Sequence, residues 1–176
     1  MCGPNRTGQT VVTGDGDALS IGGNHTMHAI RRNIDINYLL FNNEIYGLTK
    51  GQFSASADAG SLSKRGEANT MEAIDGCLLA LSLGATFVAR SFSGDKEQLV
   101  PLIKGAIGHG GAAFIDVISP CVTFNNHGGS TKSYDYVRQH IFLPAGMKDT
   151  DAYMQDAIVP NRAVGYTRES EDGKPQ

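Results

Sequence analysis

The chain has little that would place it in a membrane or on nucleic acid. No apolar run approaches the ~20 residues that a membrane-spanning helix needs, and the polar, glycine-rich N-terminus lacks the apolar core of a signal peptide. The formal net charge is −3 over 176 residues. The short basic pairs Arg31-Arg32 and Lys64-Arg65 do not form a cationic tract for a polyanion. We therefore expect neither a membrane nor a nucleic acid as a partner.

Cysteine is also scarce, and its spacing argues against a complete metal cluster within one copy of the chain. The three cysteines are Cys2, Cys77 and Cys121, and no pair has the Cys-x-x-Cys spacing of zinc and iron–sulfur sites. Cys77 lies in an apolar run and is expected to pack as a small buried hydrophobic residue. An odd number of unpaired cysteines fits the reducing cytoplasm better than a disulfide framework, so we expect a cytoplasmic protein.

The apolar residues alternate between strand-like and helix-like patterns. Short runs rich in branched or aromatic residues predict strands at residues 10–13, 36–41, 86–91 and 112–118. Helical periodicity lies between them, at residues 23–32, 70–83 and 96–107. Strands that alternate with helices predict an α/β fold in which helices cover both faces of a parallel sheet. The length suits one domain.

Two of the segments between the strands carry further expectations. The helical pattern of residues 70–83 gathers four apolar side chains on one face, those of Met71, Ile74, Leu78 and Leu81. Residues 52–69 show no periodicity, and a loop of that length without structure is usually functional or disordered. We interpret it as a mobile lid or as a loop that contacts a partner.

Acidic and amide side chains follow two of the predicted strands. Gly14-Asp15-Gly16-Asp17 comes after the first strand, and Asn42-Asn43 comes after the second. Magnesium prefers oxygen ligands and usually takes one or two protein carboxylates. The Asp15 carboxylate, the Asn43 amide oxygen and the main-chain carbonyl of Ile45 could supply such a set. The two glycines would allow close approach and unusual backbone angles, and exposed N–H groups beside them would favour a diphosphate.

Other interpretations compete for the same motif. An ordinary turn remains open for the four residues taken alone, because Asp and Gly are common in turns. A calcium loop of the EF-hand type starting at Asp15 requires a glutamate at its twelfth position, where this sequence has Thr26. A dinucleotide-binding Gly-x-Gly-x-x-Gly turn starting at Gly14 requires a third glycine where this sequence has Leu19. The last two interpretations therefore fail.

The wider sequence around these motifs resembles a known family. A Gly-Asp-Gly followed at this distance by Asn-Asn is the diphosphate-binding signature of thiamine diphosphate enzymes. Residues 14–25, 31–33, 41–52, 84–90 and 116–125 closely resemble the β subunit of 2-oxoacid:ferredoxin oxidoreductases, and the 2-oxoglutarate-type members look nearest. The similarity runs from about residue 10 to about residue 140. It implies the thiamine diphosphate-binding fold.

The resemblance also assigns site residues, and each assignment is an expectation. Asp15, Asn43 and the carbonyl of Ile45 match the family's metal ligands. The cofactor-binding positions are Gly14, Asp15, Gly16, Asp17, Asn43, Ile45, Gly47, Leu48 and Thr49. Cys121 matches the last of four cysteines that hold an iron–sulfur cluster, and Lys50 is a candidate contact for the distal carboxylate of 2-oxoglutarate. No residue is assigned a catalytic role, because in this family the activating carboxylate comes from the α subunit.

The resemblance implies a reaction and partners. It implies Mg²⁺ and thiamine diphosphate as cofactors, with the iron–sulfur cluster in the complete subunit. The implied reaction is the oxidative decarboxylation of a 2-oxoacid, in the first place 2-oxoglutarate, to an acyl-coenzyme A with reduction of ferredoxin. The partners are the α subunit, ferredoxin and coenzyme A, and we expect the chain alone to be inactive.

The domain division follows the same resemblance. Residues 1–9 form a short N-terminus outside the family pattern, where the family has a longer cysteine-bearing region, so we expect the distal part of a β subunit. Residues 10–145 form the thiamine diphosphate-binding domain, and residues 146–176 form a C-terminal extension with a frayed end. The alternative is a truncated, non-catalytic module that binds the cofactor and Mg²⁺ without turnover. A different thiamine enzyme, such as a decarboxylase, fits residues 48–52 less well.

Overall fold

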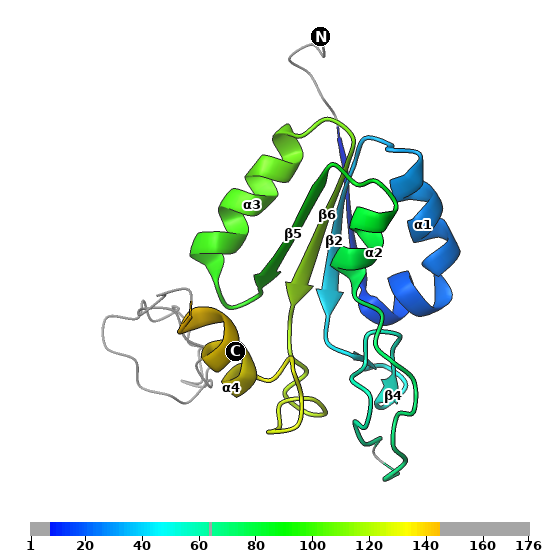
Figure 1. The fold of residues 1–176 in the computed structure, drawn as a ribbon, viewed down its shortest axis with the longest axis vertical. Helices are drawn as coiled ribbons and strands as arrows, with labels where there is room; N and C mark the ends of the chain where they lie inside the picture. Colours follow the sequence, from blue (N-terminus) through cyan, green and yellow to red (C-terminus); the bar gives the residue numbers. More distant parts are fainter. Residues whose placement is uncertain (1–7, 64, 145–176) are drawn as a thin grey trace, which may run out of the picture.

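The central feature of the fold is a four-stranded parallel sheet. The computed structural model describes residues 8–63 and 65–144, and within them the strand order is β1-β2-β6-β5 (Figure 1). The strands are β1 (Gln9–Gly14), β2 (Ile36–Asn42), β5 (Phe87–Phe92) and β6 (Ala112–Ile118). All neighbours pair in parallel. These elements match the four predicted strands to within a residue or two at each end.

Helices cover both faces of the sheet, as predicted. A π-helix η1 (Gly16–Ile21), α1 (Gly23–Arg31) and α2 (Gly76–Ser82) pack on one face, where Leu40 and Phe114 are buried against Leu19, Ile30 and Ala80. The helix α3 (Lys96–Gly108) packs on the other face, against Ile115 and Val117 among others. Figure 1 shows α3 on one side of the sheet and α1 and α2 on the other. The central strand β6 is buried along its whole length, which explains its nearly continuous apolar sequence.

The predicted helix over residues 70–83 is partly wrong. The helix α2 begins only at Gly76, because the side chain of Asp75 caps it by accepting a hydrogen bond of 3.0 Å from the Leu78 N–H. The preceding segment is tied to residues 54–58 instead, for example by a 2.7 Å bond from the Ile74 N–H to the Ala55 carbonyl. The expected apolar face lies largely in solvent, with exposed fractions of 68% for Met71, 41% for Ile74, 62% for Leu78 and 56% for Leu81.

The segment 52–69 has more structure than its sequence suggested. Gln52–Phe53 forms a short strand, β4, that pairs antiparallel with β3 (Ile45–Tyr46). Further along, Leu62 and Ala68 form an isolated bridge. The buried side chain of Asn69 donates to the carbonyls of Ala57, Asp58 and Met71. These bonds come from polar side chains that carry no periodic signal, so periodicity could not reveal them.

The remaining elements follow β6. A short helix α4 (Tyr134–Val137) continues into a second π-helix, η2 (Arg138–Phe142). Val137 and Phe142 pack against Phe92 and Ile118 at the ends of β5 and β6. These two helices were not among the elements predicted from the sequence. The predicted extension 146–176 and the N-terminal residues 1–7 lie outside the described residues.

Candidate functional site

The candidate site lies at the carboxyl ends of β1 and β2. Gly14, the last residue of β1, is in register with Phe41 of β2, so the residues that follow the two strands emerge side by side. Asp15 follows β1, and Asn43 and Glu44 follow β2. Figure 1 shows β4 and the loops after β2 and β6 at the same end of the sheet. Ligands of parallel α/β sheets bind at this end.

The Asp15 carboxylate is buried and its two oxygens are in unequal surroundings. It is 1% exposed. Its Oδ2 accepts hydrogen bonds from the Glu44 N–H at 3.0 Å and from the hydroxyls of Ser54 and Ser56. Among the described residues, Oδ1 accepts one hydrogen bond, from the Asn43 N–H at the long distance of 3.4 Å. A carboxylate oxygen can accept about two hydrogen bonds, so the spare capacity for a cation is on Oδ1.

Asn43 and Ile45 form a tight turn beside that oxygen. The Asn43 side-chain Oδ1 accepts a 3.1 Å hydrogen bond from the Ile45 N–H. Glu44 between them has a positive φ of 68°, which an L-residue adopts rarely. The turn therefore brings together Asp15 and Asn43, both predicted metal ligands. A buried carboxylate with a spare oxygen next to an amide oxygen suits a small hard cation such as Mg²⁺, with phosphate and water completing the shell.

The need for Gly16 has a different cause from the one expected. Neither Gly14 nor Gly16 has a positive φ, so unusual backbone angles do not explain them. A Cβ on Gly16 would come within 2.6 Å of the Tyr46 ring. The Tyr46 hydroxyl also donates to the Gly16 carbonyl at 2.9 Å. Gly16 therefore allows an aromatic ring to pack directly on the backbone of the Gly-Asp-Gly turn.

This packing predicts the effect of a small substitution. We expect Gly16→Ala to lower the free energy of unfolding by about 1–3 kcal/mol, the usual cost of forcing extra volume into a packed contact. The matched control is Gly23→Ala at the start of α1, because an added Cβ there meets nothing within 4 Å. Urea unfolding followed by circular dichroism measures both. Equal stability of the two variants would contradict the proposed contact.

The predicted diphosphate loop lies on the surface. Gly47, Thr49 and Lys50 are exposed, and Leu48 is 98% exposed. The Thr49 hydroxyl donates to the side chain of Gln52, and Lys50 has a positive φ of 74°. Asp17 is exposed in the first turn of η1. The structure thus buries Asp15 and Gly16 and leaves Asp17 and residues 47–50 open to solvent.

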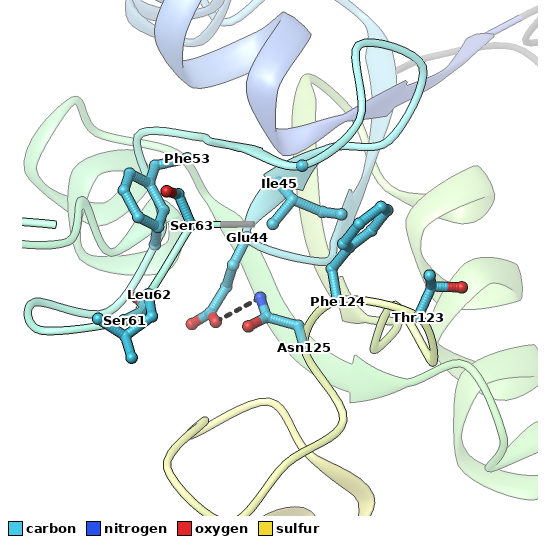
Figure 2. Close-up of a pocket in the computed structure, with 11 residues that line it drawn as sticks. Glu44, Ile45, Phe53, Ser61, Leu62, Ser63, Thr123, Phe124 and Asn125 are labelled. Carbon is cyan, nitrogen blue, oxygen red and sulfur yellow. Dashed lines mark hydrogen bonds between the residues drawn. The ribbon is translucent and has the colours of Figure 1, made fainter. Parts of the chain in front are cut away.

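A buried polar cluster beside the turn has no signal in the sequence pattern. The Glu44 side chain is fully buried, and its Oε1 lies 2.7 Å from the Lys132 Nζ. The Asn125 Nδ2 donates to Glu44 Oε2 at 2.7 Å, as Figure 2 shows. Lys132 also lies 3.5 Å from Asp58. Burial raises the pKa of the Glu44 carboxyl to about 7, although the Lys132 ammonium opposes that rise.

A cavity of about 380 Å³ adjoins the same turn. The side chains of Glu44, Phe53, Phe124 and Asn125 are among those that line it (Figure 2). The cavity therefore joins the turn after β2, the strand β4 and the loop after β6. No sequence motif connects these three segments, so only the tertiary structure could reveal it.

The two described cysteines, Cys77 and Cys121, are unpaired and half-buried. Cys77 is thus less buried than expected, and burial raises the pKa of its thiol to about 11. Cys121 follows β6, and its carbonyl accepts hydrogen bonds from the N–H groups of Phe124 and Asn125. Within residues 8–63 and 65–144, no three His, Cys, Asp or Glu side chains form a metal-binding group. The role of Cys121 as a cluster ligand stays a prediction.

The described part of the chain contains no helix long and apolar enough to cross a membrane. Its fold is an α/β domain with the candidate site at the carboxyl ends of two neighbouring parallel strands, the edge at which such sheets bind ligands. Residues 4–117 match the family model of the thiamine pyrophosphate enzymes' C-terminal TPP-binding domain, so the chain belongs to this family. Comparison with curated proteins confirms the narrower resemblance, to β subunits of 2-oxoacid:ferredoxin oxidoreductases.

Three relatives illustrate this similarity. The chain is 47% identical to the 2-oxoglutarate oxidoreductase subunit KorB of Mycobacterium tuberculosis, over 66% of this chain and 31% of that protein. It is 44% identical to the β subunit of 2-oxoacid:ferredoxin oxidoreductase 2 of Aeropyrum pernix, over 66% and 38%. A solved structure of 2-oxoglutarate:ferredoxin oxidoreductase from Magnetococcus marinus, with 2-oxoglutarate, coenzyme A and succinyl-CoA bound, has a TM-score of 0.66 and 36% identity, covering 74% of this chain and 44% of that chain.

The matched region spans less than half the length of these relatives. Features of the relatives that lie outside it are therefore not represented in the comparison. The region does include β1, β2 and the turn at Asn43, which carry the candidate site.

Proposed function

We propose that this chain is the diphosphate- and Mg²⁺-binding part of a β subunit of a 2-oxoacid:ferredoxin oxidoreductase. The observation that carries the proposal is the geometry of Asp15, whose Oδ2 is held by three donors while Oδ1 keeps spare acceptor capacity beside Asn43. A site of this kind suits a metal that bridges a carboxylate and a diphosphate. The curated relatives are subunits of such oxidoreductases, which supports the assignment.

The proposal gives each site residue a role. Asp15, the Asn43 amide oxygen and the Ile45 carbonyl would hold Mg²⁺, and the segments Gly14–Asp17 and Gly47–Thr49 would surround the diphosphate. Thiamine diphosphate would supply the chemistry that releases the carboxyl group of the 2-oxoacid as CO₂. The groups of this chain anchor and orient that cofactor. The product would be an acyl-coenzyme A, with ferredoxin as the electron acceptor.

The complete enzyme would need further components. Cys121 would provide one thiolate of an iron–sulfur cluster, which needs about four ligands. An α subunit would supply the group that activates the cofactor. The exposed apolar side chains of Met71, Ile74, Leu78 and Leu81 are consistent with burial against a partner subunit. A reducing cytoplasm would suit the free thiols of Cys77 and Cys121.

Calorimetry on the purified 176-residue chain tests the proposal. We expect thiamine diphosphate to bind in the presence of Mg²⁺ and to lose affinity when EDTA removes the metal. Thiamine monophosphate is the matched control ligand, because it lacks the bridging diphosphate. Absence of thiamine diphosphate binding in saturating Mg²⁺ would overturn the proposal.

The alternative is a non-catalytic module that binds thiamine diphosphate and Mg²⁺. Reduction of a dye acceptor by the chain mixed with an α subunit, a 2-oxoacid and coenzyme A would favour the oxidoreductase. Binding without turnover in every such mixture would favour the module.

Lys50 provides a prediction about substrate choice. It is exposed on the predicted cofactor loop, and a cation there would attract the distal carboxylate of 2-oxoglutarate. In the assembled complex, we expect Lys50→Glu to lower kcat/KM for 2-oxoglutarate about 10- to 100-fold relative to pyruvate, which lacks that carboxylate. Lys104→Glu, on the exposed side of α3, is the control. An unchanged preference for 2-oxoglutarate would refute the assignment.

A further inference from the structure

A lysine whose side chain is only 15% exposed connects the two groups of donors that hold Asp15. Lys132 lies in the loop after β6, and its Nζ is 2.7 Å from Glu44 Oε1 and 3.5 Å from Asp58 Oδ1. Glu44 provides a main-chain donor to Asp15, and Asp58 ends the segment that carries the donors Ser54 and Ser56. Lys132 therefore contacts both sides of the cradle around the Asp15 carboxylate without contacting that carboxylate itself.

Glu44 links Lys132 to Asp15 and Asn43, the two side chains predicted to bind the metal. The Glu44 N–H donates to Asp15 Oδ2 at 3.0 Å, and the Glu44 carbonyl accepts from the Ser54 N–H at 2.9 Å. The Asn125 Nδ2 donates to the Asn43 carbonyl at 2.9 Å and to Glu44 Oε2 at 2.7 Å. The side chain of Glu44 is thus anchored at both oxygens while its backbone shapes the turn between Asp15 and Asn43.

The backbone of Glu44 needs this anchoring. Its φ of 68° lies in the left-handed region, where a residue other than glycine is strained and persists only when its surroundings hold it. If the side chain were released, the turn could relax toward a negative φ. The Glu44 N–H would then rotate away from Asp15, and the Asn43 amide oxygen would move with it.

The contact through Asp58 anchors the other side of the cradle. Asp58 accepts hydrogen bonds from the Thr131 N–H at 2.8 Å and from the Thr131 hydroxyl at 2.9 Å. These bonds attach the loop that carries Lys132 to the segment 54–58. Ser54 and Ser56 of that segment donate to Asp15, so the loop after β6 sets the position of the hydroxyl donors as well.

We propose that Lys132 is a positioning residue of the Mg²⁺–diphosphate site, acting through Glu44 and Asp58 on the geometry of Asp15 and Asn43. The inference rests on the proposed function, from which it takes Mg²⁺ and the diphosphate as the ligand. Lys132 belongs to none of the sequence motifs of the site. Residues that orient metal ligands typically change metal affinity 10- to 100-fold when they are replaced.

The first test measures Mg²⁺ dependence of thiamine diphosphate binding. We expect Lys132→Met to raise the Mg²⁺ concentration for half-maximal binding about 10- to 100-fold. Lys132→Arg, which keeps the charge, should recover much of this loss. Lys104→Met is the control for loss of an exposed lysine. A Lys132→Met chain that folds and binds with wild-type Mg²⁺ dependence would overturn the proposal.

The second test needs no ligand and separates this inference from the proposed function. Hydrogen exchange of the Glu44 amide reports its bond to Asp15, and we expect about 10-fold faster exchange in Lys132→Met, while amides of β6 keep their protection. An unchanged Glu44 exchange rate would refute the positioning role even if the wild-type chain bound no thiamine diphosphate. Failure of wild-type binding alone would count against the proposed function.

A milder variant covers the case in which Lys132→Met does not fold. Glu44→Gln keeps the size of the side chain and replaces the charged partner of Lys132 by a neutral one. We expect the backbone amide of residue 44 to exchange faster than in the wild type. The Mg²⁺ concentration for half-maximal binding should rise less than in Lys132→Met. Wild-type values for both quantities in this variant would contradict the inference.

Discussion

Replacing Asp15 by asparagine is expected to abolish Mg²⁺-dependent binding of thiamine diphosphate while leaving the chain folded. The amide has nearly the same shape and keeps an acceptor for the donors around it, but it lacks the negative charge that Mg²⁺ requires. Because changes in residues that merely orient metal ligands cost about 10- to 100-fold in affinity, loss of a ligand should cost more than about 100-fold. Calorimetry in saturating Mg²⁺ measures this loss.

Asp15→Ala gives a second, separable result. The alanine leaves the Glu44 N–H and the hydroxyls of Ser54 and Ser56 without their shared acceptor. Leaving buried donors unsatisfied costs about 1–3 kcal/mol, so this variant should lose stability as well as binding. If Asp15→Asn bound the cofactor as tightly as the wild type, the assignment of Asp15 as a metal ligand would be wrong.

Removing Arg90 is expected to cause the largest loss of stability. Asp116 is fully buried in β6, and its Oδ2 lies 2.9 Å from Nη2 of Arg90 on β5. The same guanidinium bonds Asp75, the N-cap of α2, at 2.8 Å. Removing one partner of a buried pair typically costs 3–5 kcal/mol. Because the Arg90 side chain is 40% exposed, we expect the lower end of that range, about 3 kcal/mol, for Arg90→Met in urea unfolding.

The pH dependence of this loss follows from the sign of the shift at Asp116. Burial raises the pKa of this carboxyl, and the Arg90 guanidinium opposes the rise. Without Arg90 the folded-state pKa would rise further above the unfolded value of about 3.9. An acid with a raised folded pKa destabilises the fold above its unfolded pKa, so the loss should be largest near neutral pH and shrink as the pH falls.

A double variant provides the control for the Arg90 prediction. Arg90→Met combined with Asp116→Asn removes the buried negative charge together with its partner, and it should recover part of the stability. Its unfolding free energy should also vary less with pH than that of Arg90→Met alone. Equal stability of the single and double variants at neutral pH would show that the buried charge is not the cause.

The sequence predicted the fold well wherever the local hydrophobic pattern agrees with the burial of the same residues in the folded chain. The four strands are short apolar runs, and a parallel sheet covered on both faces buries such runs whatever their neighbours are. The helix predicted over residues 96–107 is likewise present as α3, which Asp95 caps by accepting a hydrogen bond from the Gln98 N–H at 3.0 Å. The helix over residues 70–83 failed because hydrogen bonds to a distant segment, such as that from Ile74 to Ala55, override local periodicity.

The candidate site also has features that the sequence indicates and features that only the folded structure reveals. The sequence by itself determined which family signature is present, and it predicted that Asp15 and Asn43 could serve one ion. The parallel pairing of β1 and β2 and the hydrogen bond from the Asn43 N–H to Asp15 bring the two residues together. Only the tertiary structure decided which oxygen of Asp15 keeps spare capacity, and that Lys132 and Asn125 support the turn. These contacts join side chains far apart in the chain, so they depend on three-dimensional packing and have no spacing that a sequence pattern could display.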